Sequence, residues 1–464
     1  MKRIAVNCSV TPPSRTPPST HSYNNGSSRV KLFASSWLPN YYATRHNNNA
    51  FIASASSVSG SEQLLDVGSK KKRKEIAGID QDELVDPKLL ADPDSCFCEF
   101  KGVHIHHKIY DSESNSQEQT SKICLPMVLL HGFGASVFSW KKVMKPLAEA
   151  TCSKVLAFDR PAFGLTSRVN LSSGTGDTKP LNAYSMAFSV LATLHFFDLL
   201  KAEKAILVGH SAGSSVAVKT YFEAPERVAA IILIAPAIFA PLTTPKVVKE
   251  NQPRQDNEMR EDNSSIRKNP IVELYISLSK VIKNVAMTIT KMMKPMIDIL
   301  NSLYRKLLSA ILLSSPAIML VRMAIDKFGT AAVRNSWYDP KQVSEHVLSG
   351  YTKPLRVKDW DRALVEFTAA TLLDEESKTK PALSKRLNEI SCPVLIVTGD
   401  SDRIVPSWNA ERLSRVIPGA SLEVIKQCGH LPHEEKVEEF ISIVENFLRK
   451  LAANSNEQYL QPAM

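Results

Sequence analysis

The stretch "KAILVGHSAGSS", residues 204–215, decides the fold class of this chain. Its first half, Ala205 to Gly209, is a run of apolar and small residues that predicts a short interior strand. The chain must then reverse sharply at Ser211, which has Gly209 and Gly213 two positions away on either side. A serine on such a strained strand-to-helix turn is held out at the top of a parallel sheet. The two glycines are expected where a side chain would clash with the turn.

The Gly-x-Ser-x-Gly pattern also arises by chance in loops, so a functional interpretation requires partners for the serine. A serine hydroxyl needs a base to accept its proton and an acid to orient that base. His430 lies in "CGHLPHEE" after the last predicted strand, and Asp402 lies in "TGDSDRIVP" after the strand expected at 394–398. The carboxyl ends of parallel strands share one edge, so we expect Ser211, Asp402 and His430 to converge there.

Apolar runs alternate with helical patterns along most of the chain, which predicts a parallel sheet covered on both faces. A strand pair turning at Lys101-Gly102 is expected within 97–110. The other predicted strands lie within 123–134, 154–164, 205–209, 228–237, 392–406 and the start of 420–451. The predicted helices lie at 136–150, 182–200, from about 212, near 408–416 and at the end of 420–451.

With these motifs in order, the chain resembles an α/β-hydrolase fold enzyme. It is similar to serine ester hydrolases, including plastid-targeted ester and lipid hydrolases, and to carbon–carbon bond hydrolases with a helical cap. The resemblance implies an α/β fold with a mostly parallel central sheet, helices on both faces and an inserted helical cap. It also implies Ser211 as nucleophile, Asp402 as acid and His430 as base. The matching stretches are "LLHGFGAS" (129–136), "DRPAFGLTSR" (159–168), "VGHSAGS" (208–214), "TGDSDRIVP" (398–406) and "GHLPHEE" (429–435).

Two backbone N–H groups are expected to bind the developing oxyanion. The turn supplies that of Ala212, directly after the nucleophile. The resemblance implies that of Phe133, in "HGFG", as the second, and it places the Phe133 ring in the acyl pocket. Nothing beyond Phe133 is predicted to bind substrate.

Neighbouring residues offer alternatives to these roles. Asp400 competes for the acid, although the family pattern, three residues after Gly399, favours Asp402. His433 competes for the base, but it lacks a preceding glycine and is expected to shape the loop. We interpret Asp159 as structural and His210 as a packed residue of the turn.

The division of the chain follows from its composition. The first 61 residues hold six of the 57 Lys and Arg residues and no Asp or Glu, and they are rich in Ser, Thr, Asn and Pro. This composition is typical of an organelle transit peptide. We predict a plastid location, with mitochondrion or cytoplasm as alternatives. The expected segments are a disordered transit peptide at 1–60, a linker at 61–95, core at 96–240, a cap or lid at 241–390, core at 391–452 and a tail at 453–464.

The predicted cap contains an apolar and basic segment at 271–330. This segment carries eight Lys and Arg residues against three Asp and Glu, and six of the twelve methionines. Apolar residues recur there at spacings of three and four, as in an amphipathic helix kinked at Pro295. Ordinary packing on the core explains this stripe, and a lipophilic substrate pocket or a peripheral membrane contact also does. The stripe consists of Leu274, Leu278, Val281, Val285, Ile289, Met292 and Met296.

Other classes of site find no support in the sequence. Seven cysteines without a Cys-x-x-Cys pair argue against a disulfide scaffold and a structural zinc site. No metal-ligand cluster or phosphate-binding glycine loop is evident, so no cofactor or metal is expected. Because the excess positive charge lies in the first 61 residues and in the cap, nucleic-acid binding is not expected either.

Three functions fit these observations. The leading hypothesis is a lipase-like or esterase-like serine hydrolase that cleaves a lipophilic carboxylic ester through an acyl-enzyme on Ser211. The second is carbon–carbon bond hydrolysis with the same three residues. The third is a ligand-sensing receptor built on this fold.

Overall fold

The computed structural model describes five segments of the chain and four isolated residues within the cap. The transit peptide, Pro295 and all seven residues of the predicted cap stripe lie outside these residues, so those predictions stay as they were. The described residues are 74–112, 124–169, 181–241, 299–373 and 382–460, together with 279, 283, 287 and 293.

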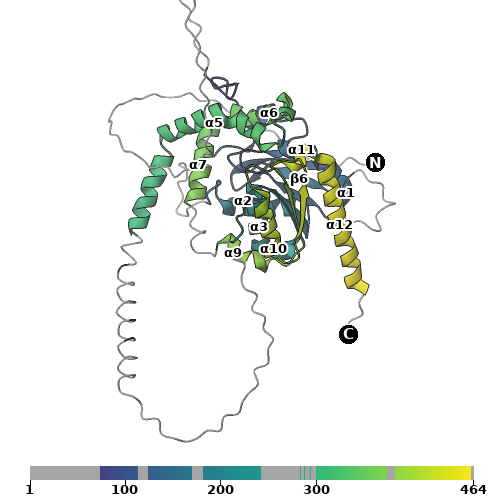
Figure 1. The fold of residues 1–464 in the computed structure, drawn as a ribbon. Coiled ribbons are helices and arrows are strands. Elements are labelled where there is room, and N and C mark those ends of the chain that lie inside the picture. The colour runs from purple at the N-terminus through teal and green to yellow at the C-terminus, as the bar shows by residue number, and fades with distance from the viewer. Residues whose placement is uncertain are drawn as a thin grey trace, which may run out of the picture. The chain divides into compact units, whose positions relative to one another are not determined.

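An eight-stranded sheet forms the centre of the molecule (Figure 1). Its order is β10-β9-β8-β7-β5-β6-β4-β3. All neighbouring pairs are parallel except the two that involve β4, where the predicted hairpin forms one edge. The mostly parallel sheet is therefore confirmed. The strands are β3 (Cys96–Phe100), β4 (Val103–Tyr110), β5 (Met127–Leu130), β6 (Val155–Phe158), β7 (Ala205–His210), β8 (Val228–Ile234), β9 (Val394–Gly399) and β10 (Ser421–Ile425).

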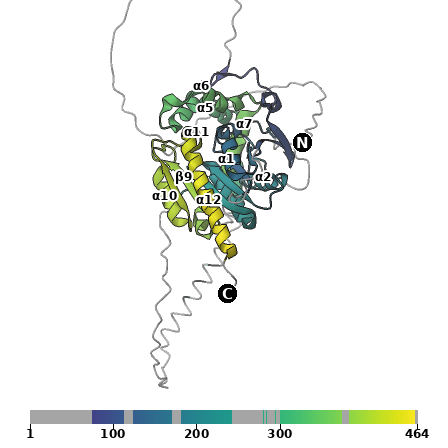
Figure 2. The ribbon, with the colours of Figure 1, turned by 90° about the vertical axis from the view of Figure 1, so that its right-hand side faces the viewer.

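Helices cover both faces of this sheet, as the continuous apolar strands require. One face packs against α2 (Met186–Leu199), α3 (Ala212–Glu223) and α10 (Ser407–Val416). The other face packs against α1 (Met144–Thr151) and α12 (Val437–Leu460). Figure 2 shows α12 running across that second face. The two hydrophobic cores fix the strand ends that carry the site.

Two predicted boundaries are wrong in the core. The helix expected at 136–150 is divided into η3 (Val137–Trp140) and α1, because Ser136 accepts the N–H of Phe138 and caps a separate short turn. The tail expected to begin at 453 instead continues α12 to Leu460, since no glycine or proline follows Leu451 until Pro462.

The cap lies over the carboxyl ends of the strands, at the top of Figures 1 and 2. Its helices are Ile299–Leu312, α5 (Ser315–Ser336), α6 (Glu345–Thr352) and α7 (Trp360–Leu372), with short turns η6 (Pro340–Gln342) and η7 (Lys353–Arg356). The expected end of the cap at 390 is too late. Leu387 and Ile390, at the end of α9 (Leu383–Arg386) and η8 (Leu387–Glu389), are buried in the core.

Within the residues described, no single helix is both long and apolar enough to cross a membrane. The helix 299–312 and α5 meet that test only as a pair, and they are bent by 54° at Leu313 and Ser314. The bend comes immediately before Pro316, whose ring cannot continue a preceding helix.

The predicted linker at 61–95 differs from the structure over residues 74–95, which are folded. They form the small hairpin β1 (Glu75–Ile76) and β2 (Ile79–Asp80), followed by η1 (Pro87–Leu90). Val85 pairs with Val357, and the indole N–H of Trp360 donates to Gln81 at 3.0 Å. The partners lie about 270 residues further along the chain, so the local sequence carried no sign of them.

Candidate active site

The turn at Ser211 has the strained geometry that the sequence pattern predicts. Ser211 has φ 50° and ψ −118°, between the end of β7 and the start of α3. A Cβ on Gly213 would lie 2.1 Å from the carbonyl oxygen of Leu130, and one on Gly209 would lie 2.7 Å from Cα of Ser214. The Ser211 N–H donates to Ile234 at 2.9 Å. The sheet and the absence of two side chains therefore allow a backbone conformation that a serine rarely adopts.

His430 and Asp402 meet at the same edge of the sheet. Nδ1 of His430 lies 2.8 Å from Oδ2 of Asp402, and both residues are buried. The other carboxylate oxygen, Oδ1, accepts the N–H groups of Ile404 and Val405 at 2.8 and 2.9 Å. A carboxylate fixed in this way orients the imidazole and supports its protonated form.

The alternative acid, Asp400, faces away from this histidine. Its Oδ1 accepts the hydroxyl of Ser401 at 2.9 Å and the N–H of Cys428 at 3.4 Å. The structure therefore pairs His430 with Asp402 rather than with Asp400.

Glu435 holds the loop that carries His430, a contribution that the sequence analysis missed. Its carboxylate accepts the N–H of Gly429, on the residue before the histidine, and that of Leu431, on the residue after it, at 3.0–3.1 Å. It also accepts the N–H of Tyr338 from the cap at 2.7 Å. Its position in "GHLPHEE" was the only hint of this role in the sequence, but a glutamate at this position is equally typical of the first turn of a helix.

The cap also touches the histidine loop directly. The N–H of His430 donates to the carbonyl oxygen of Ser336, the last residue of α5, at 2.7 Å. A Cβ on Gly429 would lie 2.4 Å from that same oxygen, so only glycine permits this approach. The end of α5 is thus joined to the loop of the proposed base.

His210 and His433 are packed residues. Nε2 of His210 lies 3.0 Å from the carbonyl oxygen of His430, and the ring of His433 lies 4.4 Å from that of Trp140. Burial lowers the pKa of His210 well below its usual value and lowers that of His433 to about 3. Both rings stay neutral near pH 7, which agrees with the packing roles expected for them.

Asp159 is structural, as expected. One oxygen bonds the His106 ring at 2.6 Å and the Leu165 N–H at 2.7 Å, and the other accepts the Val137 N–H at 2.7 Å. Burial alone would raise the pKa of Asp159, but His106 and the other neighbours lower it to about 2. This carboxylate ties the loop after β6 to the loop after β5.

The two predicted oxyanion donors belong to segments beside Ser211. Ala212 is the first residue of α3, and Phe133 lies in the loop after β5. The Phe133 ring is 58% exposed, and it packs edge-on against Phe163 with 5.5 Å between centroids. Both Phe133 and Ser211 border one cavity.

That cavity has a volume of about 360 Å³ and lies between the core and the cap. Ser211 and His430 lie at its base. The cap supplies apolar residues from α5 (Ile325, Ala332 and Val333), α6 (Leu348) and α7 (Trp360 and Leu364). Among the described residues that line it, Arg168 alone is a Lys, Arg, Asp or Glu residue. Its guanidinium donates to the carbonyl oxygens of Phe163, Gly164 and Thr166 at 2.6–3.0 Å.

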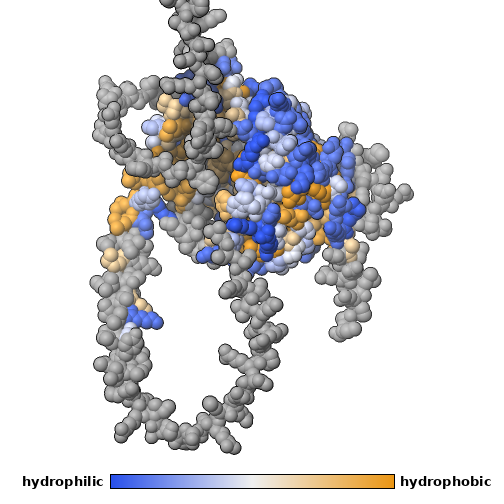
Figure 3. All heavy atoms as spheres, viewed as in Figure 1, coloured by the Kyte–Doolittle hydropathy of each residue, from blue (hydrophilic) through white to orange (hydrophobic). Residues whose placement is uncertain are grey.

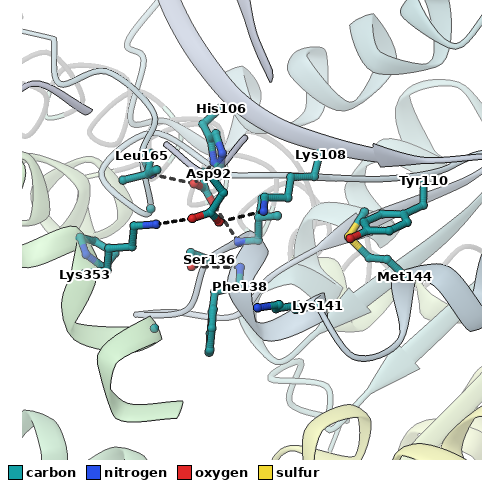
Figure 4. A pocket seen from close by; sticks show the side chains of 15 residues that line it. Asp92, His106, Lys108, Tyr110, Ser136, Phe138, Lys141, Met144, Leu165 and Lys353 are labelled. Atoms are coloured by element: carbon teal, nitrogen blue, oxygen red, sulfur yellow. Dashed lines mark hydrogen bonds and ion pairs between the residues drawn. The ribbon is translucent and has the colours of Figure 1, made fainter. Parts of the chain in front are cut away.

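A second pocket, of about 40 Å³, contains an ion network (Figure 4). Asp92 lies between Lys353 of the cap and Lys108 of β4, with each ammonium nitrogen 2.8 Å from a carboxylate oxygen. Burial opposes ionisation, but the two lysines lower the pKa of Asp92 to about 2. Because the pocket is small and neither Ser211 nor His430 lines it, we assign it to attachment of the cap.

Within the described residues, no group of three or more His, Cys, Asp or Glu side chains could hold a metal ion. Among the six described cysteines, Cys428 is buried. Burial raises the pKa of Cys428, as expected for a packed thiol rather than a reactive one.

Comparison with known proteins agrees with this fold. The model of the Alpha/beta hydrolase family matches residues 127–443, more than half of the chain. The "Uncharacterized hydrolase YugF" of Bacillus subtilis is 22% identical over 75% of this chain and 95% of its own length. A 2-hydroxy-6-oxononadienedioate/2-hydroxy-6-oxononatrienedioate hydrolase of Klebsiella pneumoniae is 25% identical over 70% of this chain and 87% of its own.

A solved structure, that of wild-type Cfl2 from Burkholderia cenocepacia, shares the fold. It has a TM-score of 0.50 and 17% sequence identity. The match covers 77% of this chain and 98% of that one.

Proposed function

Because this chain belongs to the alpha/beta hydrolase family and is therefore a hydrolase, we propose that it is a serine hydrolase that cleaves a lipophilic carboxylic ester. The observation that carries the proposal is that Ser211 and His430 border one apolar cavity, with Asp402 bonded to Nδ1 of His430. Nucleophile, base and orienting acid are the groups that acyl transfer needs.

In the proposed first step, Oγ of Ser211 attacks the ester carbonyl carbon while Nε2 of His430 accepts the hydroxyl proton. The carbonyl oxygen becomes an anion that the N–H groups of Phe133 and Ala212 stabilise. Asp402, bonded to Nδ1, supports the imidazolium. Collapse of the intermediate breaks the bond to the alcohol oxygen, which leaves with the proton from His430. An ester of Ser211 remains.

In the second step, water replaces the alcohol. His430 accepts a proton from water as its oxygen attacks the acyl carbon, and the same N–H groups stabilise the second oxyanion. Collapse returns the proton to Oγ of Ser211 and releases the carboxylic acid. Each oxyanion donor typically contributes about 3 kcal/mol to such transition states.

The lining of the cavity supports a lipophilic substrate. Its walls are mostly aliphatic and aromatic, and burial of apolar substrate surface there is favourable by about 25 cal/mol per Å². Nη1 and Nη2 of Arg168 already donate to three backbone carbonyls, which leaves only the buried Nε without a hydrogen-bond partner among the described residues. The Klebsiella relative is named for a dicarboxylate, and binding two carboxylates in a buried site requires cationic partners. This lining therefore favours a neutral acyl chain.

The test is a panel of p-nitrophenyl esters from two to sixteen acyl carbons, with the full chain, Ser211→Ala and the control Ser401→Ala. We expect kcat/KM to rise with chain length, to fall by at least about 10³-fold in Ser211→Ala and to stay within threefold in Ser401→Ala. A folded wild-type chain without ester turnover would overturn the proposal. Turnover of dienoic diketone-type substrates would then identify carbon–carbon hydrolysis, and slow turnover with ligand-dependent partner binding would identify a receptor.

A further inference from the structure

An arm of the cap carries apolar side chains into solvent. On the helix 299–312, six of them are 51–64% exposed: Ile299, Leu300, Leu303, Tyr304, Leu307 and Ile311. The same surface continues onto the first half of α5 through Met319, Leu320 and Met323. Figure 3 shows apolar surface along this arm. Exposed apolar surface that extends over two helices marks a site of interaction rather than ordinary scatter.

The spacing of these residues places them on one face of each helix. At 100° per residue, the six side chains of the first helix fall within an arc of about 140°. Met319, Leu320 and Met323 fall within an arc of about 100° on α5. The residues of α5 that line the cavity, including Ile325, Gly329 and Val333, lie mostly on other faces. Packing on the core therefore does not account for this apolar face.

The charge of the arm is positive. Residues 299–328 hold Arg305, Lys306, Arg322 and Lys327 against a single acidic residue, Asp326. Arg322 is paired with Asp361 at 2.6 Å, and Asp326 accepts the N–H of Ala77 at 3.0 Å. Lys306 and Lys327 are exposed beside the apolar residues. An apolar face flanked by basic side chains complements a membrane surface that contains anionic lipids.

The other half of α5 is held by the protein. The residues around Gly329 line the cavity, and the Ser336 carbonyl accepts the N–H of His430. Because these contacts fix the second half of α5, the bent pair of helices cannot cross a bilayer without unpacking the site. The arm is instead suited to lie in the plane of a membrane surface.

We propose that the arm formed by the helix 299–312 and the first part of α5, up to Phe328, binds the surface of a bilayer containing anionic lipids, which brings the mouth of the cavity to its lipid substrate. This inference deepens the proposed function, on which its statement about substrate rests, but membrane binding is measured independently of hydrolysis. One continuous helix, α5, carries the membrane contact at one end and contacts the His430 loop at the other.

The test is flotation of the full chain with vesicles of phosphatidylcholine containing 30% phosphatidylglycerol. All proteins carry Ser211→Ala, so hydrolysis cannot change the vesicles and a failure to bind is distinct from a failure to cleave. The variant is Leu303→Glu with Leu307→Glu. Its matched control is Leu372→Glu, an equally exposed leucine at the end of α7, outside the arm. Circular dichroism and thermal unfolding establish that each protein is folded.

We expect the double variant to lose at least about tenfold in apparent vesicle affinity and the control to keep it within twofold. In an otherwise wild-type chain, the same double variant keeps its turnover of a soluble short-chain ester, because neither leucine lines the cavity. Absence of vesicle binding by the parent, or equal binding by both variants, would overturn the proposal. A concentration-dependent dimer that the double variant abolishes, without vesicle binding, would also overturn it and identify a second copy as the occupant.

A second arm of the experiment tests the charge. Lys306→Glu with Lys327→Glu is expected to reduce binding to the anionic vesicles at least about tenfold, with little change on pure phosphatidylcholine. The control Lys450→Glu, on the exposed side of α12, should change binding less than twofold. Equal losses in the control would show that net charge alone, including that of the first 61 residues, accounts for the attraction.

Discussion

The base of the cavity and its roof come from different parts of the chain and are stabilised in different ways. At the base, Ser211, Asp402 and His430 follow strands of one sheet, and bonds from the backbone hold the loops that carry them. At the roof, α5, α6 and α7 present apolar walls, and α5 extends into an arm whose apolar face is exposed.

This difference teaches where chemistry and selectivity reside. A reacting group must be held within fractions of an ångström, so the base of the cavity relies on close-packed glycines and on carboxylates whose oxygens are all hydrogen-bonded. A roof that admits acyl chains needs only shape and apolar surface. Substitutions at the base of the cavity should therefore change kcat by orders of magnitude. Substitutions in the roof should instead change the range of substrates, the stability of the protein or its binding to membranes.

The largest expected effect separates the two candidate acids. Asp402→Asn removes the charge that supports the imidazolium of His430 and disturbs its orientation, so kcat should fall by about 10³–10⁴-fold. Asp400→Asn should keep kcat within threefold, because its carboxylate bonds Ser401 and Cys428 rather than the histidine. Steady-state kinetics on one ester decides the matter. A loss in Asp400→Asn equal to that in Asp402→Asn would contradict the site described.

The next prediction compares a glycine at the base of the cavity with a glycine in its roof. Gly213→Ala directs a Cβ to within 2.1 Å of the Leu130 carbonyl oxygen, so the free energy of unfolding should fall by about 1–3 kcal/mol and activity should fall with it. Gly329→Ala in α5 meets only Ile325, at 3.4 Å, and should raise the free energy of unfolding by about 0.5–1 kcal/mol. Denaturant unfolding measures both, and equal destabilisation would contradict the comparison.

A smaller effect on kcat is expected at the contact between the base of the cavity and its roof. Glu435→Gln replaces one carboxylate oxygen with an amide N–H₂ that opposes the N–H donors of Gly429, Leu431 or Tyr338. Because Glu435 positions His430 without touching substrate, kcat should fall about tenfold while KM stays within twofold. Glu438→Gln, at the exposed start of α12, is the control. A change in KM alone would contradict a positioning role.

A last effect concerns the pH dependence of stability. Burial raises the pKa of Glu434 to about 8, while Tyr351 donates to its carboxylate and Lys142 and Glu435 lie nearby. Because the native state holds this proton more tightly than the unfolded chain, stability is greatest below about pH 4.5 for this group and is lost as pH rises to about 8.

In Glu434→Gln the decline in the free energy of unfolding between pH 5.5 and 8.5 should therefore be shallower than in the wild type. Urea denaturation at both pH values, with Glu438→Gln as control, measures the two slopes. Identical slopes in wild type and variant would show that Glu434 titrates normally in the folded protein.

The core was largely predictable because its signals are local. Continuous apolar runs identified the strands, and the glycines around Ser211 predicted the strained turn, at which Ser211 has φ 50° in the structure. The edge of a parallel sheet then brought Asp402 and His430 together. The split of 136–150 was not predictable in full, because the separate turn after Ser136 is also held by Asp159, whose carboxylate accepts the N–H of Val137. The order within 74–95 was not predictable, because it depends on partners such as Trp360 from elsewhere in the chain.

By itself, the sequence determined the fold class, the strand ends and which serine, aspartate and histidine could meet, since strand periodicity and turn strain are properties of neighbouring residues. Only the tertiary structure decided that Glu435 and Ser336 hold the histidine loop, and that α5 both walls the cavity and bears an exposed apolar face. These features depend on contacts between segments distant in the chain, whose distances no local pattern encodes.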